Sequence, residues 1–351
     1  MNKKIKIANY SVSPNDPPFI IAEMSGNHNL SLERALEIVE SAAGAGVHAI
    51  KLQTYTADTM TIDVDNEAFL INDPESPWNG LSLYKLYQQA HTPWEWHEPI
   101  FKRCHKLGLT VFSTPFDETA VDFLEDLNVP AYKIASFENN HLPLIRKTAS
   151  TGKPLIISTG MASIPELDDA VRTARNAGCE DIILLKCTSS YPARPNDTNL
   201  RTIPHLRKLF DTEVGLSDHT PGIGVSIASV ALGATVIEKH FTLARADGGV
   251  DSAFSMEPHE MELLVKETYK AWQALGKISY ESTEKEKAST KFRRSVYVVD
   301  DVKKDEKFTT KNLRVIRPGD GLPSKYFGIL LGKKASCDVK KGAPMSWKLV
   351  G

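Results

Sequence analysis

Three lysines stand at the ends of short apolar runs, where a charged side chain is unusual. Lys51, Lys133 and Lys186 end the runs AIK, AYK and IILLK. A buried ammonium group is costly unless an anion neutralises it. A single lysine there would suit a buried ion pair or a Schiff base, whereas three from separate runs favour a bound phosphate or carboxylate. Hydroxyl groups that could assist such binding are those of Thr114, Ser136, Ser158 and Ser189.

Two histidines and a glutamate form a second candidate group. His219 in LSDHT and His240 in EKHFT close two consecutive runs, and Glu23 ends the first run, FIIAE. Imidazoles on neighbouring strands, with a carboxylate beside them, can bind a divalent metal and leave positions open for water and substrate. The metal would polarise a carbonyl or orient a water. The spacing equally allows histidines that only form hydrogen bonds, and a Glu23 that acts as a general base.

Eight apolar runs carry these residues: FIIAEM, AIKLQT, TVFSTPF, AYKIAS, PLIISTG, IILLKCT, EVGLSDH and VIEKHFT. Such runs, alternating with helical segments, are typical of a parallel sheet covered on both faces, and eight of them predict an α/β fold, a (β/α)₈ TIM barrel. Active sites of these barrels lie at the carboxyl ends of the strands. We therefore expect one mouth to gather Glu23, Lys51, Gln53, Thr114, Lys133, Ser136, Ser158, Lys186, Ser217, His219 and His240.

The connectors support the barrel, with one exception. Helical spacing is present in SLERALEIVESAAGAG, from Thr92 to Leu107 and from Ile164 to Ala177. The connector after LQTYT, which includes SPWNGLSLYKLYQQAHTPWEWH, is far longer than a usual βα loop. Because insertions at this face give barrels their specificity, we assign it to recognition of a ring with apolar and polar faces. A structural lid or a dimer contact is the alternative.

The composition changes after Gly276. A charged segment, ISYESTEKEKASTKF, leads into short β-prone pieces separated by Asp, Gly and Lys turns. We expect a barrel domain over residues 1–278, a linker over 279–291 and a small β-rich domain over 292–351.

Bulk properties exclude several classes of function. The chain of 351 residues has 41% hydrophobic and 25% charged residues, as ordinary globular proteins do. A net charge of −2 argues against nucleic-acid binding. The segment MNKKIKIANYSVSPNDPP lacks the apolar core of a signal peptide, and no run is long enough to span a membrane. Four cysteines without metal-ligand spacing favour reduced thiols, so we expect a cytoplasmic protein.

Many blocks in order resemble one family, the sialic acid synthases. The blocks are IAEMSGNHN, AIKLQT, STPFD, YKIAS, ISTGM, KCTSSYPA, GLSDHT and EKHFT, and FRRSVYVV and RPGDGLP resemble the family's C-terminal antifreeze-like (SAF, β-clip) domain. The family condenses phosphoenolpyruvate with an acylated amino sugar to give a nine-carbon 2-keto acid and phosphate. Met24, Ser25, Leu30 and the long connector resemble the pseudaminic acid synthase branch, whose sugar is 2,4-diacetamido-2,4,6-trideoxyaltrose.

The resemblance implies roles for individual residues. Phosphoenolpyruvate would be held by Lys51, Thr114, Lys133, Ser136, Ser158, Lys186, Ser189 and Ser217. His219 and His240 would bind Mn²⁺ or Mg²⁺, with Co²⁺ as a third option, and Glu23 would act beside the metal. The sugar would contact Gln53, Glu138, Tyr191, Asp251 and Arg317, the last from the SAF domain of the other subunit in a domain-swapped homodimer.

Three alternatives stay open at this stage. An N-acetylneuraminate or legionaminate synthase would share the catalytic residues and differ in its sugar. A lysine-dependent aldolase would form a Schiff base with its substrate. A non-catalytic carbohydrate- or surface-binding protein would not need aligned lysines and histidines at strand ends.

Overall fold

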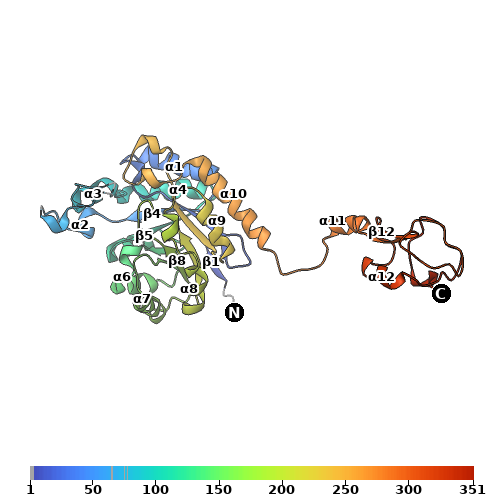
Figure 1. Ribbon diagram of the computed structural model, residues 1–351. Helices are drawn as coiled ribbons and strands as arrows, with labels where there is room; N and C mark the ends of the chain where they lie inside the picture. Colours follow the sequence, from blue (N-terminus) through green and yellow to red (C-terminus); the bar gives the residue numbers. More distant parts are fainter. Residues whose placement is uncertain (1–3, 65, 75, 77) are drawn as a thin grey trace. The chain divides into compact units, whose positions relative to one another are not determined.

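The computed structural model describes residues 4–64, 66–74, 76 and 78–351, so Pro77 of the long connector lies outside the described residues. The chain forms two compact units, residues 1–276 and 277–351 (Figure 1).

Eight parallel strands close into a barrel in the first unit, which confirms the predicted TIM fold. Each predicted run forms one strand, and hydrogen bonds between the last strand and the first complete the closure. The strands are β3 (Phe19–Glu23), β4 (Ala49–Thr54), β5 (Thr110–Pro115), β6 (Tyr132–Ile134), β7 (Leu155–Ser158), β8 (Ile182–Cys187), β9 (Glu213–Ser217) and β10 (Val236–His240). The register pairs Glu23 with both Lys51 and His240, so three predicted site residues are neighbours at the carboxyl ends.

Helices follow the strands and cover the outside of the barrel (Figure 1). They are α1 (Leu32–Gly44), α4 (His97–Lys106), α5 (Glu118–Asp126), α6 (Leu142–Ala149), α7 (Ile164–Asn176), α8 (Thr202–Phe210), α9 (Gly224–Ala231) and α10 (Pro258–Leu275). Local sequence explains their starts: the Ser31 side chain accepts from the Arg34 amide at α1, and Ser163 and Glu166 form a capping box at α7. The helix expected from Thr92 begins later, at His97, because the chain first makes a 3₁₀ turn after Pro93.

A hairpin covers the amino-terminal end of the barrel. Strands β1 (Ile5–Ile7) and β2 (Tyr10–Val12) pair antiparallel, and their apolar side chains join the barrel core. The Tyr10 ring lies 5.3 Å from that of Phe19, the first residue of β3. The opposite end of the barrel stays available for the site.

Several short 3₁₀ helices follow the strands at that end. They are η1 (Ser25–His28), η4 (Ser136–Glu138), η5 (Pro195–Asp197), η6 (Arg245–Asp247) and η7 (Ser252–Phe254).

The long connector between β4 and α4 contains α2 (Ala57–Met60), η2 (Glu67–Phe69), α3 (Leu83–Ala90) and η3 (Trp94–Trp96). Buried histidines anchor its carboxyl-terminal end. His28 Nε2 lies 3.2 Å from Thr92 Oγ1, and His97 Nε2 lies 2.8 Å from Thr54 Oγ1. Both hydrogen bonds join the connector to the ends of barrel elements.

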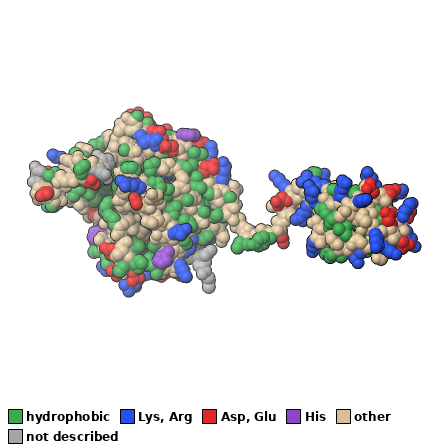
Figure 2. Space-filling view, in the orientation of Figure 1, with side chains coloured by type: hydrophobic (Ala, Val, Ile, Leu, Met, Phe, Trp, Pro, Cys, Tyr) green, Lys and Arg blue, Asp and Glu red, His purple; other side chains and the backbone are tan. Residues whose placement is uncertain are grey.

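The second unit has a small core of its own. Strands β11 (Ser295–Val298) and β12 (Leu313–Ile316) form an antiparallel pair, accompanied by α11 (Glu284–Lys287), η8 (Ala288–Phe292), η9 (Ser324–Tyr326), α12 (Phe327–Leu330) and η10 (Trp347–Leu349). Val296, Phe308 and Leu330 are buried in this core. Lysines and arginines outnumber acidic residues two to one in this unit, whereas acidic residues predominate in residues 1–276. Figure 2 shows many lysine and arginine side chains on the surface of the second unit. No helix in the described part of the chain could cross a membrane.

The buried histidines predict a loss of stability in acid. Burial lowers the pKa of His97 to about 4, so between about pH 6.5 and 4 only the unfolded chain takes up this proton. The free energy of unfolding should therefore fall as the pH drops through this window. Between pH 7 and pH 5, the free energy of unfolding, measured with urea, should fall by about 2 kcal/mol less in His97→Gln than in the unmodified protein. His205→Gln, at an exposed position, is the control. The same loss in His97→Gln as in the control would contradict this account.

Candidate active site

A cavity of about 420 Å³ opens at the carboxyl ends of the barrel strands. Most of the predicted site residues line it: Glu23, Lys51, Gln53, Lys133, Ser136, Glu138, Ser158, Tyr191, Ser217, His219, His240 and Asp251. Strand ends thus bring together side chains that lie more than 200 residues apart in the sequence.

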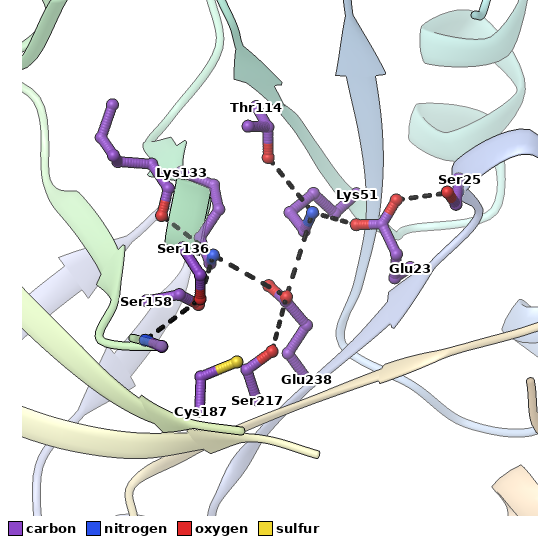
Figure 3. Close-up of polar contacts among 12 residues, drawn as sticks. Glu23, Ser25, Lys51, Thr114, Lys133, Ser136, Ser158, Cys187, Ser217 and Glu238 are labelled. Atoms are coloured by element: carbon purple, nitrogen blue, oxygen red, sulfur yellow. Dashed lines mark hydrogen bonds and ion pairs between the residues drawn. The ribbon is translucent and has the colours of Figure 1, made fainter. Parts of the chain in front are cut away.

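Four buried charges occupy the floor of the cavity (Figure 3). Lys51 forms an ion pair with Glu23, and its Nζ lies 3.9 Å from Glu238 Oε1. Lys133 Nζ lies 3.8 Å from the same Glu238 oxygen, which also accepts a hydrogen bond of 3.2 Å from Ser217. These charged side chains are at most 7% exposed. Each lysine therefore depends on a carboxylate for its charge compensation.

The hydroxyl groups complete the surroundings of the two lysines. Lys51 donates to Thr114 Oγ1 at 3.1 Å, and Lys133 donates to Ser158 Oγ at 2.7 Å. Gly160 lies beside them, and a Cβ there would come within 2.5 Å of Ser136 Oγ and 2.1 Å of Ser189 Oγ. Only a glycine leaves these two hydroxyl groups in place. Backbone and hydroxyl donors beside two ammonium groups suit a phosphate or carboxylate.

Burial and pairing shift the pKa values of these groups in different directions. Burial raises the pKa of Glu23, and Lys51 opposes this shift only in part. Burial acts to lower the pKa of Lys51, but the charges of Glu23 and Glu238 outweigh it and raise the pKa. At Lys133 burial prevails and the pKa lies below its ordinary value. Lys133 is therefore the less compensated cation and would gain more from a bound anion.

The two histidines adjoin this cluster. His219 Nδ1 lies 3.0 Å from the carbonyl oxygen of Thr188, to which it can donate, so its Nε2 is available as a ligand. The ring centroids of His219 and His240 are 5.3 Å apart. His240 Nδ1 is buried and has no hydrogen-bond partner in the described structure, and burial holds the His240 pKa well below its ordinary value. A neutral imidazole with an unsatisfied buried nitrogen fits a metal ligand.

The two imidazoles do not form a complete metal cage. Within residues 4–64, 66–74, 76 and 78–351, no three side chains of His, Cys, Asp or Glu converge closely enough to hold a metal ion. His240 Nδ1 lies 3.9 Å from Asp251 Oδ2, whose carboxylate accepts a hydrogen bond from Ser25. A metal at this place would rely on two histidines and on ligands from substrate or water.

A buried ion pair behind the histidines holds their backbone. Lys239 Nζ donates to Asp218 Oδ2 at 3.0 Å and to the carbonyl oxygens of Thr220 and Gly222 at 2.7 and 3.0 Å. Asp218 and Lys239 directly precede His219 and His240, and their side chains are 1% exposed. The pair fixes the loop after β9, which carries His219, to the end of β10, which carries His240.

Two predicted site residues lie elsewhere. Successive residues of a strand point to opposite faces, and on β8 Cys187 takes the position facing the cavity. Lys186 therefore points away and donates to Cys187 O at 2.8 Å and to Thr188 Oγ1 at 3.1 Å. The structure does not bring Lys186 to the anion-binding cluster. Arg317 belongs to the second unit.

Sequence reasoning missed Glu238 and most of the cavity's apolar side. Glu238 could have been found, because it precedes His240 by two residues on β10 and must share its face. Part of the apolar lining does carry a signal, because Leu83, Leu86 and Ala90 recur at helical spacing on α3, whereas Ile71 and Trp78 lie in irregular chain. His28 and Asn29 tie η1 to neighbouring segments, since His28 Nε2 lies 3.2 Å from Thr92 Oγ1 and Asn29 Nδ2 donates to Gly248 O at 3.2 Å.

The fold and the cavity define a TIM-barrel enzyme whose site sets two lysines, two carboxylates and several hydroxyl groups beside two imidazoles. Residues 38–280 match the NeuB family, and residues 293–350 match the SAF domain. The chain belongs to the NeuB family.

Relatives and solved structures agree with this assignment. Pseudaminic acid synthase of Campylobacter jejuni is 44% identical over 324 residues, which cover 92% of this chain and 94% of that protein. An N,N'-diacetyllegionaminic acid synthase of the same species is 35% identical over 92% of this chain and 97% of its own length. The crystal structure of N-acetylneuraminic acid synthetase from Leptospira borgpetersenii, in complex with citrate, superimposes with a TM-score of 0.73 at 32% identity and covers 82% of this chain and 95% of that one.

The shared carboxylate of Glu238 predicts how the free site responds to anions. Glu238→Gln should lower the free energy of unfolding by about 3 kcal/mol, because it leaves the two buried lysines with one carboxylate. A bound anion would replace the missing charge, so inorganic phosphate should raise the Tm more in this variant than in the unmodified protein. Thermal unfolding with and without phosphate measures both effects.

The matched control is Glu262→Gln, which removes an exposed partner of Lys266 on α10. It should change neither the stability nor the response to phosphate appreciably. Equal stabilisation by phosphate in Glu238→Gln and in the control would contradict the assigned role.

Proposed function

We propose that the chain is a pseudaminic acid synthase. It condenses phosphoenolpyruvate with the open-chain aldehyde of 2,4-diacetamido-2,4,6-trideoxyaltrose and water, and releases pseudaminic acid and inorganic phosphate. The observation that carries the proposal is the buried pair of lysines, set among hydroxyl groups and next to two imidazoles. The identity of 44% to a pseudaminic acid synthase, against 35% to a legionaminic acid synthase, supports this sugar.

The floor of the cavity would bind phosphoenolpyruvate. Lys51 and Lys133 neutralise its phosphate and carboxylate, and the hydroxyl groups of Thr114, Ser136 and Ser158 donate hydrogen bonds. Ser189 and Ser217 lie at the edge of the same group, while Lys186 is left out of it. These groups are already ordered by one another, so they need not reorient as charge moves during the reaction.

The reaction joins two carbons and then breaks a C–O bond. The methylene carbon of phosphoenolpyruvate attacks the aldehyde carbon, whose oxygen takes a proton, and carbon 2 becomes a cation. Water adds to that cation with loss of a proton, and the tetrahedral intermediate expels phosphate. Glu23 and Glu238 place two carboxylates beside the lysines that hold the substrate, where they stabilise the cation or orient the water.

His219 and His240 are the residues that would hold the divalent metal, which we propose to be Mn²⁺ or Mg²⁺, with Co²⁺ as a third candidate. A metal bound there would supply Lewis-acid polarisation of the sugar's carbonyl oxygen. Gln53, Glu138, Tyr191 and Asp251 line the cavity, which supports their proposed contact with the sugar. The use of phosphoenolpyruvate and the four free cysteines support a cytoplasmic location.

Phosphate release tests the reaction and the sugar together. With phosphoenolpyruvate and Mn²⁺, we expect release with the diacetamido-trideoxyaltrose and little with N-acetylmannosamine or the legionaminate precursor. His240→Ala should abolish turnover while the far-UV circular dichroism stays unchanged. Preference for another sugar would refute the proposed specificity. Release with none, or a substrate adduct trapped by borohydride, would refute the proposed chemistry.

We also propose that Arg317 completes the barrel site of a second subunit in a domain-swapped homodimer. The opposite charges of the two units support such docking between copies of the chain. The arrangement makes each site depend on both chains, with His240 from one and Arg317 from the other.

Mixing an inactive variant with one that binds the sugar weakly tests this arrangement. Arg317→Ala should weaken sugar binding more than binding of phosphoenolpyruvate, and His240→Ala should be inactive. After subunit exchange, a mixture of the two should regain up to about a quarter of the normal activity, since half of the dimers are mixed and one of their two sites is intact. No recovery, once exchange is verified, would contradict the trans arrangement.

A further inference from the structure

The cavity has two sides of different chemistry. Barrel strands and the segments that follow them supply most of its charged groups, whereas the connector between β4 and α4 supplies most of its aliphatic side chains, together with Tyr55, Asp73, Ser76 and Tyr87. We call the second group the apolar wall: Met60, Ile71, Trp78, Leu83, Leu86 and Ala90. Asp73 is the one charged side chain that the described part of the connector adds to the lining.

The apolar wall is fixed to the barrel at several points. Trp78 Nε1 donates to the carbonyl oxygen of Val250 at 2.7 Å. Helix α3 packs closely on η1, because a Cβ at Gly26 would lie only 3.1 Å from Ala90 Cα. Backbone hydrogen bonds from Ile71 to Leu81, at 2.9 Å, and from Gly80 to Ile71, at 2.8 Å, close the loop between η2 and α3. The wall is therefore a built surface of the cavity.

Aromatic rings lead from the histidines to this wall. The Tyr191 ring lies 4.5 Å from that of His219, and the Phe254 ring lies 5.0 Å from that of His240. Trp78 forms the next layer, 5.7 Å from Tyr191 and 6.4 Å from Phe254. A sugar whose aldehyde carbon reacts beside the histidines must extend away from them. Its far end, carbons 5 and 6, then reaches the apolar wall.

We propose that the apolar wall is the subsite for the methyl group at carbon 6 of a 6-deoxy sugar. This inference rests on the proposed function and deepens it, because it assigns the choice of sugar to the connector. A methyl group gains by leaving water for such a surface. A hydroxyl group at carbon 6 would lose its hydrogen bonds to water, and the aliphatic side chains of the wall would offer none in return. Apolar pockets discriminate against an added hydroxyl group by about 100-fold at most.

The test compares two sugars that differ only at carbon 6. One is 2,4-diacetamido-2,4,6-trideoxyaltrose, and the other is its counterpart with a hydroxyl group at that carbon. Leu86→Gln places an amide of similar size in the wall, and Met60→Gln does so at a half-buried position that tolerates the change if Leu86→Gln fails to fold. Ile62→Gln, on the same connector but 60% exposed and outside the lining, is the control.

We expect the unmodified enzyme and Ile62→Gln to prefer the 6-deoxy sugar in kcat/KM. Leu86→Gln or Met60→Gln should reduce that preference by about 10-fold or more, since the 6-deoxy sugar loses its apolar contact and the hydroxyl group gains a partner. The KM for phosphoenolpyruvate should stay within about twofold of the unmodified value, because its site lies on the barrel floor.

Other outcomes separate this inference from the proposed function. Equal losses for both sugars would overturn the inference and make the wall a contact for an acetamido group or a purely structural lid. An unchanged preference in both variants would also overturn the inference. The proposed function would still be supported in that case if the unmodified protein released phosphate with the 6-deoxy sugar. No turnover of either sugar by the unmodified protein would overturn both.

Discussion

The shared carboxylate of Glu238, buried between Lys51 and Lys133, is the interaction on which the site depends. Two lysines without water are stable only if anions lie near, and the barrel supplies two carboxylates at the right depth. The strand register makes this possible, since β10 closes onto β3 and places Glu23 and His240 side by side. The strand pairing that closes the barrel therefore also brings the compensating charges together at its mouth.

The charge balance also explains why the cavity suits anionic substrates. The carboxylates compensate the lysines unequally, and the low pKa of Lys133 reflects its incomplete compensation. A bound phosphate would complete the charge compensation of Lys133, so binding would remove an electrostatic cost that the free protein already carries. In the proposed complex, the hydroxyl groups around Gly160 would orient the phosphate, and one of them, Ser136 Oγ, accepts a hydrogen bond of 3.1 Å from the Gly160 amide. Affinity and orientation would then come from different groups.

Much of this could be predicted from the sequence, because strand runs and their terminal residues are local signals. Eight runs predicted eight strands, and Lys51, Lys133, His219 and His240 were expected at one mouth. Lys186 was placed with them because its run ends on it, yet the pleat of β8 turns its side chain outward. The carboxyl end of a run locates a residue along the barrel axis. Predicting which face of the strand the residue takes requires the register of the whole strand.

The apolar side of the cavity shows a different limit. Ile71 and Trp78 lie between η2 and α3, where no helical periodicity marks the side that each residue presents. Their positions result from tertiary contacts such as the hydrogen bond from Trp78 to Val250. Sequence length and aromatic content could indicate a recognition element, but only folding onto the barrel defines its surface.

The different roles proposed for the barrel floor and the connector have a physical cause. A change at a charged strand end disturbs a buried network, whose broken pairs cost about 3 to 5 kcal/mol. A change among apolar residues of the connector alters shape and polarity at the far end of the cavity and leaves that network intact. The barrel can therefore keep one reaction while the connector determines which sugar fits. The connector side chains, whose positions are the hardest to predict from the sequence, are thus those that the reaction chemistry constrains least.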